Sequence, residues 1–207
     1  MSAEANGAPV AQPASFSFSP ENLAKARAHI AKYPAGRQAS AVLPLLELAQ
    51  TQAGGWLPRA AMDHVAAVLD MAPIRVYEVA SFYSMLNLQP VGRNLIQICR
   101  TTPCWLRGAD DLSNTCKSKL GVGFKEVTAD GKFSVMEVEC LGACANAPVV
   151  QINNDYYTDL DAAKMEALLA ALGRGEQPKP GSATGRQGSA PDGGPTTLLD
   201  LAPAERK

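Results

Sequence analysis

Four of the five cysteines lie in two short motifs in the second half of the 207-residue chain. They are Cys99 and Cys104 in ICRTTPC, and Cys140 and Cys144 in CLGAC. Each pair follows an apolar run typical of a β-strand, NLIQICR at 94–100 and KFSVMEVEC at 132–140. Thiol loops at the ends of two strands can meet at one point, so we expect either a metal site or a pair of disulfides.

The expected compartment argues against disulfides. The N-terminal segment has no apolar stretch typical of a secretory signal, and no Lys or Arg precedes Lys25. We therefore expect the chain to stay in a reducing cytoplasm, where stable disulfides are rare. The formal net charge of −1 gives no electrostatic basis for binding nucleic acid. No apolar run approaches the ~20 residues of a membrane span, so we expect no direct membrane insertion.

The spacing within the cysteine pairs favours an iron–sulfur cluster. Zinc ribbons and redox dithiols typically have two residues between paired cysteines, whereas these pairs enclose four and three. A two-iron cluster takes four thiolates and is less strict about loop length. The small residues Gly142 and Ala143 would let backbone N–H groups approach the sulfurs, as would Thr101 and Thr102 in the other loop. A structural zinc site and thiol chemistry remain open at this point.

The first half of the chain predicts a small helical bundle at residues 19–88. Apolar residues at helical spacing indicate four short helices, each too short to persist alone in water. Ser19 and Pro20 predict the start of the first helix. Residues 1–18 are expected to form a flexible arm, in which Phe16 and Phe18 are interpreted as incidental aromatics. His29 and His64 are interpreted as surface or packing residues.

The second half predicts a compact α+β domain at residues 93–174. The expected order is a strand ending at Cys99, a helix over 105–120, a hairpin of strands 124–130 and 132–139, a further strand pair and a final helix capped by Asp161. This order matches a thioredoxin-like layout and predicts a cis bond at Ala147-Pro148. Residues 175–207 are expected to be an extended tail, in which three leucines are interpreted as a docking segment. They are Leu198, Leu199 and Leu201.

Two signatures together resemble one family. The segment VYEVASFY at 76–83 and the motif CLGACANAP at 140–148 are similar to the small iron–sulfur subunit of NADH:quinone oxidoreductase, respiratory complex I. The resemblance runs from about residue 20 to residue 175. It implies a thioredoxin-like ferredoxin domain with one [2Fe–2S] cluster held by Cys99, Cys104, Cys140 and Cys144. Cys116 has no counterpart in the motif and is interpreted as a packed helix cysteine.

The resemblance also implies a role and its partners. It implies an electron-transfer subunit, inactive alone, next to a flavoprotein subunit that binds NADH and FMN and to the large iron–sulfur subunit. The expected location is peripheral, on the cytoplasmic side of the bacterial inner membrane. The absence of a Gly-rich dinucleotide motif agrees with NADH and FMN belonging to the partner. The alternatives are the equivalent subunit of a soluble NAD-linked hydrogenase or formate dehydrogenase, a zinc-stapled interaction protein and, least favoured, a thiol–disulfide oxidoreductase.

Overall fold

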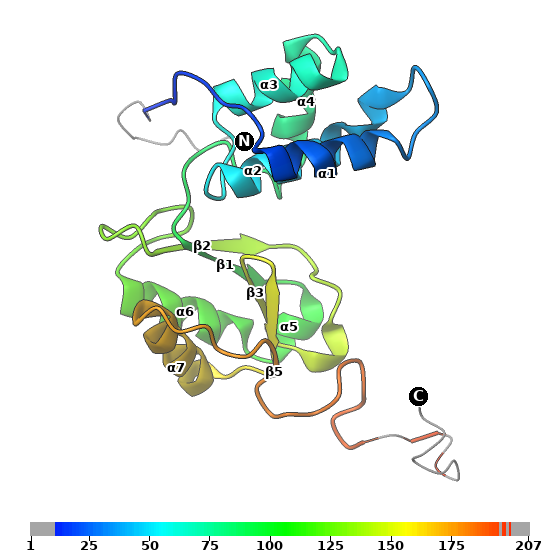
Figure 1. Cartoon of the computed structure of the whole chain (residues 1–207). Coiled ribbons are helices and arrows are strands. Elements are labelled where there is room, and N and C mark those ends of the chain that lie inside the picture. Colours follow the sequence, from blue (N-terminus) through cyan, green and yellow to red (C-terminus); the bar gives the residue numbers. More distant parts are fainter. Residues whose placement is uncertain (1–10, 195, 198, 200–207) are drawn as a thin grey trace. The chain divides into compact units, whose positions relative to one another are not determined.

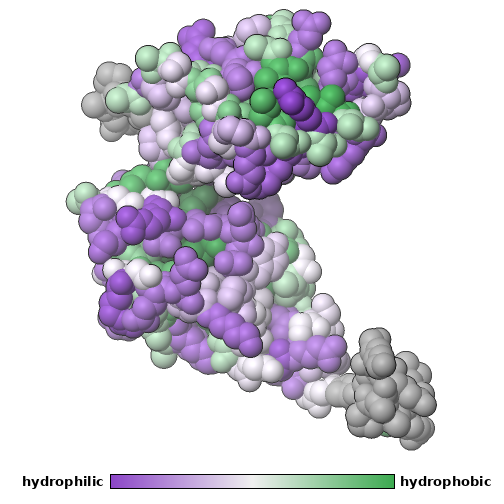
Figure 2. Space-filling view, in the orientation of Figure 1, coloured by the Kyte–Doolittle hydropathy of each residue, from purple (hydrophilic) through white to green (hydrophobic). Residues whose placement is uncertain are grey.

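The computed structural model describes residues 11–194, 196, 197 and 199. The chain divides into two compact units, residues 1–91 and 92–207 (Figure 1). On the face shown in Figure 2, hydrophilic and hydrophobic residues are interspersed over both units. Of the three leucines expected to dock, Leu198 and Leu201 lie outside the described residues, while Leu199 is exposed.

The first unit is helical, as the apolar periodicity predicted. Its elements are α1 (Pro20–Ile30), the 3-10 helix η1 (Gln38–Ala41), α2 (Val42–Gln52), α3 (Arg59–Leu69) and α4 (Pro73–Phe82). The Ser19 hydroxyl accepts a hydrogen bond from the backbone N–H of Asn22 and caps α1, as expected. Leu45, Val65 and Val76 from three of these helices are fully buried in a common core, which supplies the stability that each helix lacks alone.

The two phenylalanines before α1 are not incidental, so their interpretation was wrong. Phe18 is only 7% exposed and belongs to the core of the helical unit, while Phe16 packs against it. Both rings meet His64 edge-on, with ring centroids 5.1 Å away for Phe18 and 5.7 Å away for Phe16. The backbone N–H of Phe18 donates to His64 Nε2 at 3.3 Å. The expected packing role of His64 is confirmed, and it anchors the residues that precede α1.

The second unit contains a five-stranded mixed sheet in the order β2-β1-β3-β4-β5. Its strands are β1 (Asn94–Cys99), β2 (Phe133–Val138), β3 (Val149–Ile152), β4 (Asp155–Thr158) and β5 (Gly181–Ser182). Strand β1 pairs in parallel with β2 and antiparallel with β3, and β4 pairs antiparallel with β3 and in parallel with β5. The α+β class is therefore as expected.

Helices α6 (Ala109–Leu120) and α7 (Ala162–Gly173) pack side by side over this sheet (Figure 1). Leu112, Cys116 and Met165 from these helices are fully buried with Ile96 and Ile98 from β1. The Asp161 carboxylate caps α7 by accepting from the backbone N–H of Lys164 at 2.8 Å, as predicted. No helix in the described part of the chain is both long and apolar enough to cross a membrane.

Two local expectations differ from the structure. The helix predicted over 105–120 is interrupted, because Gly108 adopts a left-handed backbone (φ 96°) between α5 (Thr102–Leu106) and α6. The hairpin predicted around Asp130-Gly131 has its turn, but its first strand is reduced to isolated bridges from Phe124 and Val127 to β2. Lys125 between them also has a positive φ of 65°, which breaks the extended pairing. The predicted cis bond at Ala147-Pro148 is confirmed.

Candidate metal centre

Parallel pairing of β1 and β2 brings the two cysteine motifs to one edge of the sheet. Cys99 is the last residue of β1 and lies opposite Val138, the last residue of β2. Cys104 follows in α5, Cys140 follows β2, and Cys144 begins the short 3-10 helix η2 (Cys144–Asn146). Since parallel strands end at the same edge, both thiol loops start from neighbouring points.

The thiols are close enough to influence one another. The Sγ atoms of Cys140 and Cys144 are 3.6 Å apart. Two thiolates on one tetrahedral metal at about 2.3 Å would lie roughly 3.8 Å apart, so this separation fits a shared metal ion. Burial is the main cause that raises the pKa of Cys104 to about 12, with further contributions from the thiols of Cys99 and Cys144. The pKa of Cys140 is lowered by the Gly142 amide and then by the Cys144 thiol and the Thr101 hydroxyl.

Groups in both loops donate to the sulfurs. The backbone N–H of Gly142 donates to Cys140 Sγ at 3.4 Å, and the Thr101 hydroxyl lies 3.3 Å from Cys99 Sγ. Gly142 has a φ of 81°, a left-handed conformation that suits glycine and directs its amide toward the thiol. Burial acts to raise the pKa of Cys99, but hydrogen bonds from Thr101 and the Leu141 amide lower it overall. The donor set therefore suits a negatively charged sulfur centre.

The four thiols differ in exposure, and the difference follows the two motifs. Cys99 and Cys104 are buried, each 1% exposed, whereas Cys140 and Cys144 are exposed. Among the described residues, no three His, Cys, Asp or Glu side chains are arranged around one point to hold a single ion. In a two-iron cluster each iron takes two thiolates, and a buried pair together with an exposed pair is compatible with that requirement.

An ion-pair network that the sequence did not reveal lies beside the first loop. Arg100, directly after Cys99, pairs with Glu137 on β2 and, at 2.8 Å, with Asp110 on α6. Trp105 donates from its indole nitrogen to Asp110 at 3.1 Å and is 54% exposed. These contacts join the first ligand loop to the elements on either side of it.

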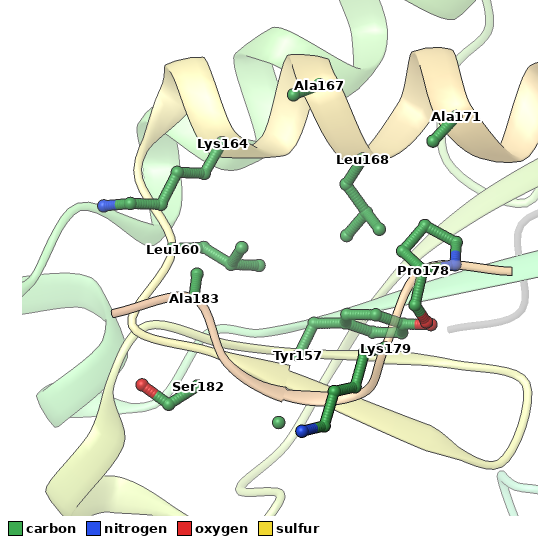
Figure 3. Close-up of a pocket in the computed structure, with 11 residues that line it drawn as sticks. Tyr157, Leu160, Lys164, Ala167, Leu168, Ala171, Pro178, Lys179, Ser182 and Ala183 are labelled. Carbon is green, nitrogen blue, oxygen red and sulfur yellow. The ribbon is translucent and has the colours of Figure 1, made fainter. Parts of the chain in front are cut away.

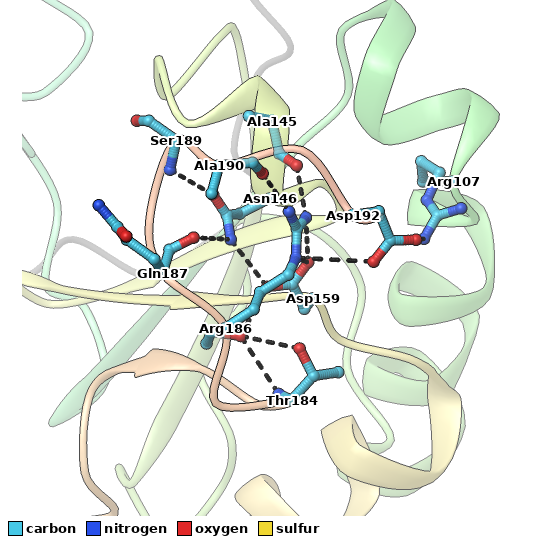
Figure 4. A network of polar contacts seen from close by, with 11 residues as sticks. Arg107, Ala145, Asn146, Asp159, Thr184, Arg186, Gln187, Ser189, Ala190 and Asp192 are labelled. Atoms are coloured by element: carbon cyan, nitrogen blue, oxygen red, sulfur yellow. Dashed lines mark hydrogen bonds and ion pairs between the residues drawn. The ribbon is translucent and has the colours of Figure 1, made fainter. Parts of the chain in front are cut away.

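Polar side chains from distant parts of the chain hold the second ligand loop. The Tyr156 hydroxyl donates to the Leu141 carbonyl at 2.8 Å. The Asn146 side chain donates to the Asp159 carboxylate at 2.9 Å. The same carboxylate accepts a hydrogen bond from Arg186 in the tail (Figure 4). No periodic pattern marks these residues, and of them Asn146 alone lies next to a ligand motif, two residues after Cys144.

Cys116, the fifth cysteine, lies in helix α6 and in neither ligand loop. Cys116 is fully buried in the core of the second unit, where burial raises its pKa to about 12, in keeping with a packed cysteine.

A pocket of about 260 Å³ lies between α7 and residues 178–183 (Figure 3). Tyr157, Leu168 and Pro178 line it, and none of the four loop cysteines is among its lining residues.

Comparison with known proteins gives consistent matches. A sequence model of the thioredoxin-like [2Fe-2S] ferredoxin family matches residues 26–173. A subunit of the NADH-quinone oxidoreductase of Rickettsia bellii is 60% identical over 157 residues, which are 76% of this chain and 94% of that protein. The mitochondrial NADH dehydrogenase [ubiquinone] flavoprotein 2 of Dictyostelium discoideum is 48% identical over 89% of this chain and 75% of its own length.

One solved structure extends the comparison to a different class of enzyme. The NAD+-reducing [NiFe]-hydrogenase in its H2-reduced state aligns with a TM-score of 0.56 at 26% identity. The alignment covers 65% of this chain but only 23% of the hydrogenase chain.

Proposed function

The chain belongs to the thioredoxin-like [2Fe–2S] ferredoxin family, among the members that are subunits of NADH-quinone oxidoreductase, and we propose that Cys99, Cys104, Cys140 and Cys144 bind its cluster. It is thus an electron-transfer subunit of complex I. When bound, a [2Fe–2S] cluster accepts and releases one electron at a time. The chain's own part is to hold the cluster, supply hydrogen bonds to its sulfurs and limit the access of water to it.

The observation that carries the proposal is the meeting of two thiol pairs at one edge of the sheet. Cys99 and Cys104 would hold one iron within the domain, and Cys140 and Cys144 would hold the other at the surface. The Gly142 amide and the Thr101 hydroxyl would stabilise the negative charge on the sulfurs.

The partners proposed for this chain are the flavoprotein subunit that binds NADH and FMN and the large iron–sulfur subunit. The exposure of Cys140 and Cys144 supports this assignment, because a partner can approach that side of the centre closely. The proposed location is peripheral, on the cytoplasmic side of the bacterial inner membrane. A place in a soluble NAD-linked hydrogenase is the second candidate, supported by the structural similarity at 26% identity. The 60% identity to a quinone oxidoreductase subunit favours complex I.

The test is anaerobic purification of the full chain and of five single Cys→Ser variants. We expect about two irons per chain and a low-temperature EPR signal after reduction with dithionite. Serine at any of the four proposed ligands should abolish or strongly alter the signal, whereas Cys116→Ser, the matched control, should retain it. A colourless wild-type protein with stoichiometric zinc would contradict the proposal. Cluster loss in Cys116→Ser alone would contradict the ligand assignment.

Co-expression with the candidate flavoprotein subunit tests the partner. We expect the two chains to co-purify and NADH to reduce the cluster in the pair but not in the isolated chain. Association with a soluble hydrogenase module in place of quinone-reducing membranes would favour the second candidate.

A further inference from the structure

We propose that Arg186 is a positioning residue for the candidate cluster, because it ties the C-terminal segment to the loop that carries Cys144. The inference rests on the proposed function, since it concerns how one pair of cluster ligands is held. It assigns a task to residues 181–192, which lie beyond the region that matches the family model, residues 26–173.

The Arg186 guanidinium binds three groups at once (Figure 4). Its Nε and Nη2 atoms donate to the same carboxylate oxygen of Asp159 at 2.9 and 2.6 Å. Nη2 also donates to the Ala145 carbonyl, directly after Cys144, and Nη1 donates to the Ala190 carbonyl. A planar fork of donors can serve acceptors in several directions, which a lysine ammonium on its flexible stem does less well.

The ion pair at the centre of this arrangement is shielded from water. The Asp159 side chain is 5% exposed and the Arg186 side chain 16%. The second carboxylate oxygen of Asp159 accepts from Ser182 at 2.6 Å and from Asn146 at 2.9 Å, so both oxygens are used. Removing one partner would leave a buried, partly uncompensated carboxylate, which is far more costly than losing an exposed ion pair.

Asn146 transmits the contact to the ligand loop. It lies two residues after Cys144 and is 2% exposed. Its side-chain oxygen accepts from the backbone N–H of Ser189 at 2.7 Å, and its backbone N–H donates to the Ala143 carbonyl at 2.9 Å. Its backbone carbonyl accepts from the N–H of Asp159, which follows β4, at 2.9 Å. The loop is therefore bonded on one side to the end of β4 and on the other to the tail.

Outside the network around Arg186, the segment is held at its start by β5, which pairs with β4 and not with the ligand loop. Upstream, the 260 Å³ pocket separates residues 178–183 from α7 (Figure 3), so apolar packing there is incomplete. Downstream, the Asp192 side chain is 74% exposed and lies 3.9 Å from Arg107 and 3.8 Å from Arg186, in long contacts of little energetic value. The buried polar contacts around Arg186 are thus the main attachment of the segment to the ligand loop.

The inference is tested with the full-length, cluster-loaded chain carrying Arg186→Gln. Loss of a charge-assisted, buried network should raise the population of the detached segment, and with it the rate of iron release to a chelator, by about tenfold or more. Hydrogen–deuterium exchange should accelerate at residues 142–147 and 181–190 while β1 and α6 stay unchanged. The EPR line shape of the reduced cluster should also change. Arg186→Lys should show a smaller change in each measurement, because it keeps the charge.

Arg174→Gln is the matched control, since Arg174 forms an exposed ion pair with Glu176 in the same part of the chain. It should behave as the wild type in all three measurements. Wild-type release and exchange rates in Arg186→Gln, or an exchange increase spread evenly over residues 92–194, would overturn the positioning role. A wild-type chain that binds no cluster would instead overturn the proposed function and this inference with it.

Discussion

Gly92 lies where the backbone of the second unit allows no side chain at all. A Cβ atom at this position would lie 2.3 Å from the carbonyl carbon of Phe133 and 2.7 Å from its Cα and N atoms. The obstacle is the backbone of β2, which cannot rotate away as a flexible side chain could. The N–H of Gly92 also donates to the Ser134 hydroxyl at 2.8 Å, so a shift of the chain would break that buried bond.

Gly92→Ala should therefore be among the most destabilising small substitutions in this chain. Relieving the overlap requires a backbone displacement of about 1 Å, for which overpacking costs of roughly 3 kcal/mol or more are expected. Domains are stable by only about 5–15 kcal/mol, so this is a large share of the total. Gly173→Ala is the control, because its Cβ would lie 3.9 Å from the ring of the same Phe133, in ordinary contact. Alanine in helix α7 should change stability by no more than about 1 kcal/mol, in the stabilising direction.

The assay is urea unfolding followed by tryptophan fluorescence in a Trp56→Phe background. Trp105 is then the remaining tryptophan and lies in residues 92–207, so the signal reports on the second unit. We expect a clearly lower midpoint for Gly92→Ala and an equal or higher one for Gly173→Ala. If Gly92→Ala unfolds within about 0.5 kcal/mol of the parent, the close approach of residue 92 to β2 is refuted.

Three further predictions concern charge and capping. Burial lowers the pKa of His64, whose neutral ring accepts a hydrogen bond from the backbone N–H of Phe18. As the pH falls below about 6.5, His64 therefore takes up a proton more readily in the unfolded chain than in the folded one. The stability of the helical unit should thus fall as pH drops from about 7 to 5, and His64→Gln should show a flatter pH profile in thermal denaturation. Asp161→Ala removes the cap on Lys164 N–H and should cost about 1 kcal/mol in the same measurement; no loss would contradict the capping role. Glu139 directly precedes the proposed ligand Cys140, so Glu139→Gln removes a negative charge beside it and should raise the cluster's midpoint potential. An EPR redox titration showing no change would rule this out.

The expectations that held were those carried by local chemistry or by strong periodicity. The α1 cap at Ser19, the α7 cap at Asp161 and the cis bond at Ala147-Pro148 each depend on a few neighbouring residues. The resemblance to the complex I subunit is confirmed by the family match and by relatives at 60% and 48% identity. That the four loop cysteines are the ligands stays a prediction until the cysteine variants are measured.

The features that escaped sequence reasoning depend on long-range contacts. Arg186 and Asp159 are 27 residues apart in the chain, and Arg186 lies in a segment of small and polar residues without periodicity. Phe18 is 46 residues from His64, and nothing in the intervening sequence indicates their contact. The sequence predicts one helix through Gly108, because a single glycine inside an apolar pattern does not show whether the chain turns there.

The edges of the sheet bear on how readily the chain aggregates before it binds other subunits. An open strand edge invites pairing with another chain and is a common start of aggregation. Here β5 covers β4 at Tyr157 and Thr158, and residues 124–128 bond to the outer side of β2 at 133–135. The edge that stays open on either strand, within the described residues, is only a few residues long. The covered edges therefore disfavour edge-to-edge strand pairing between newly made copies of the chain.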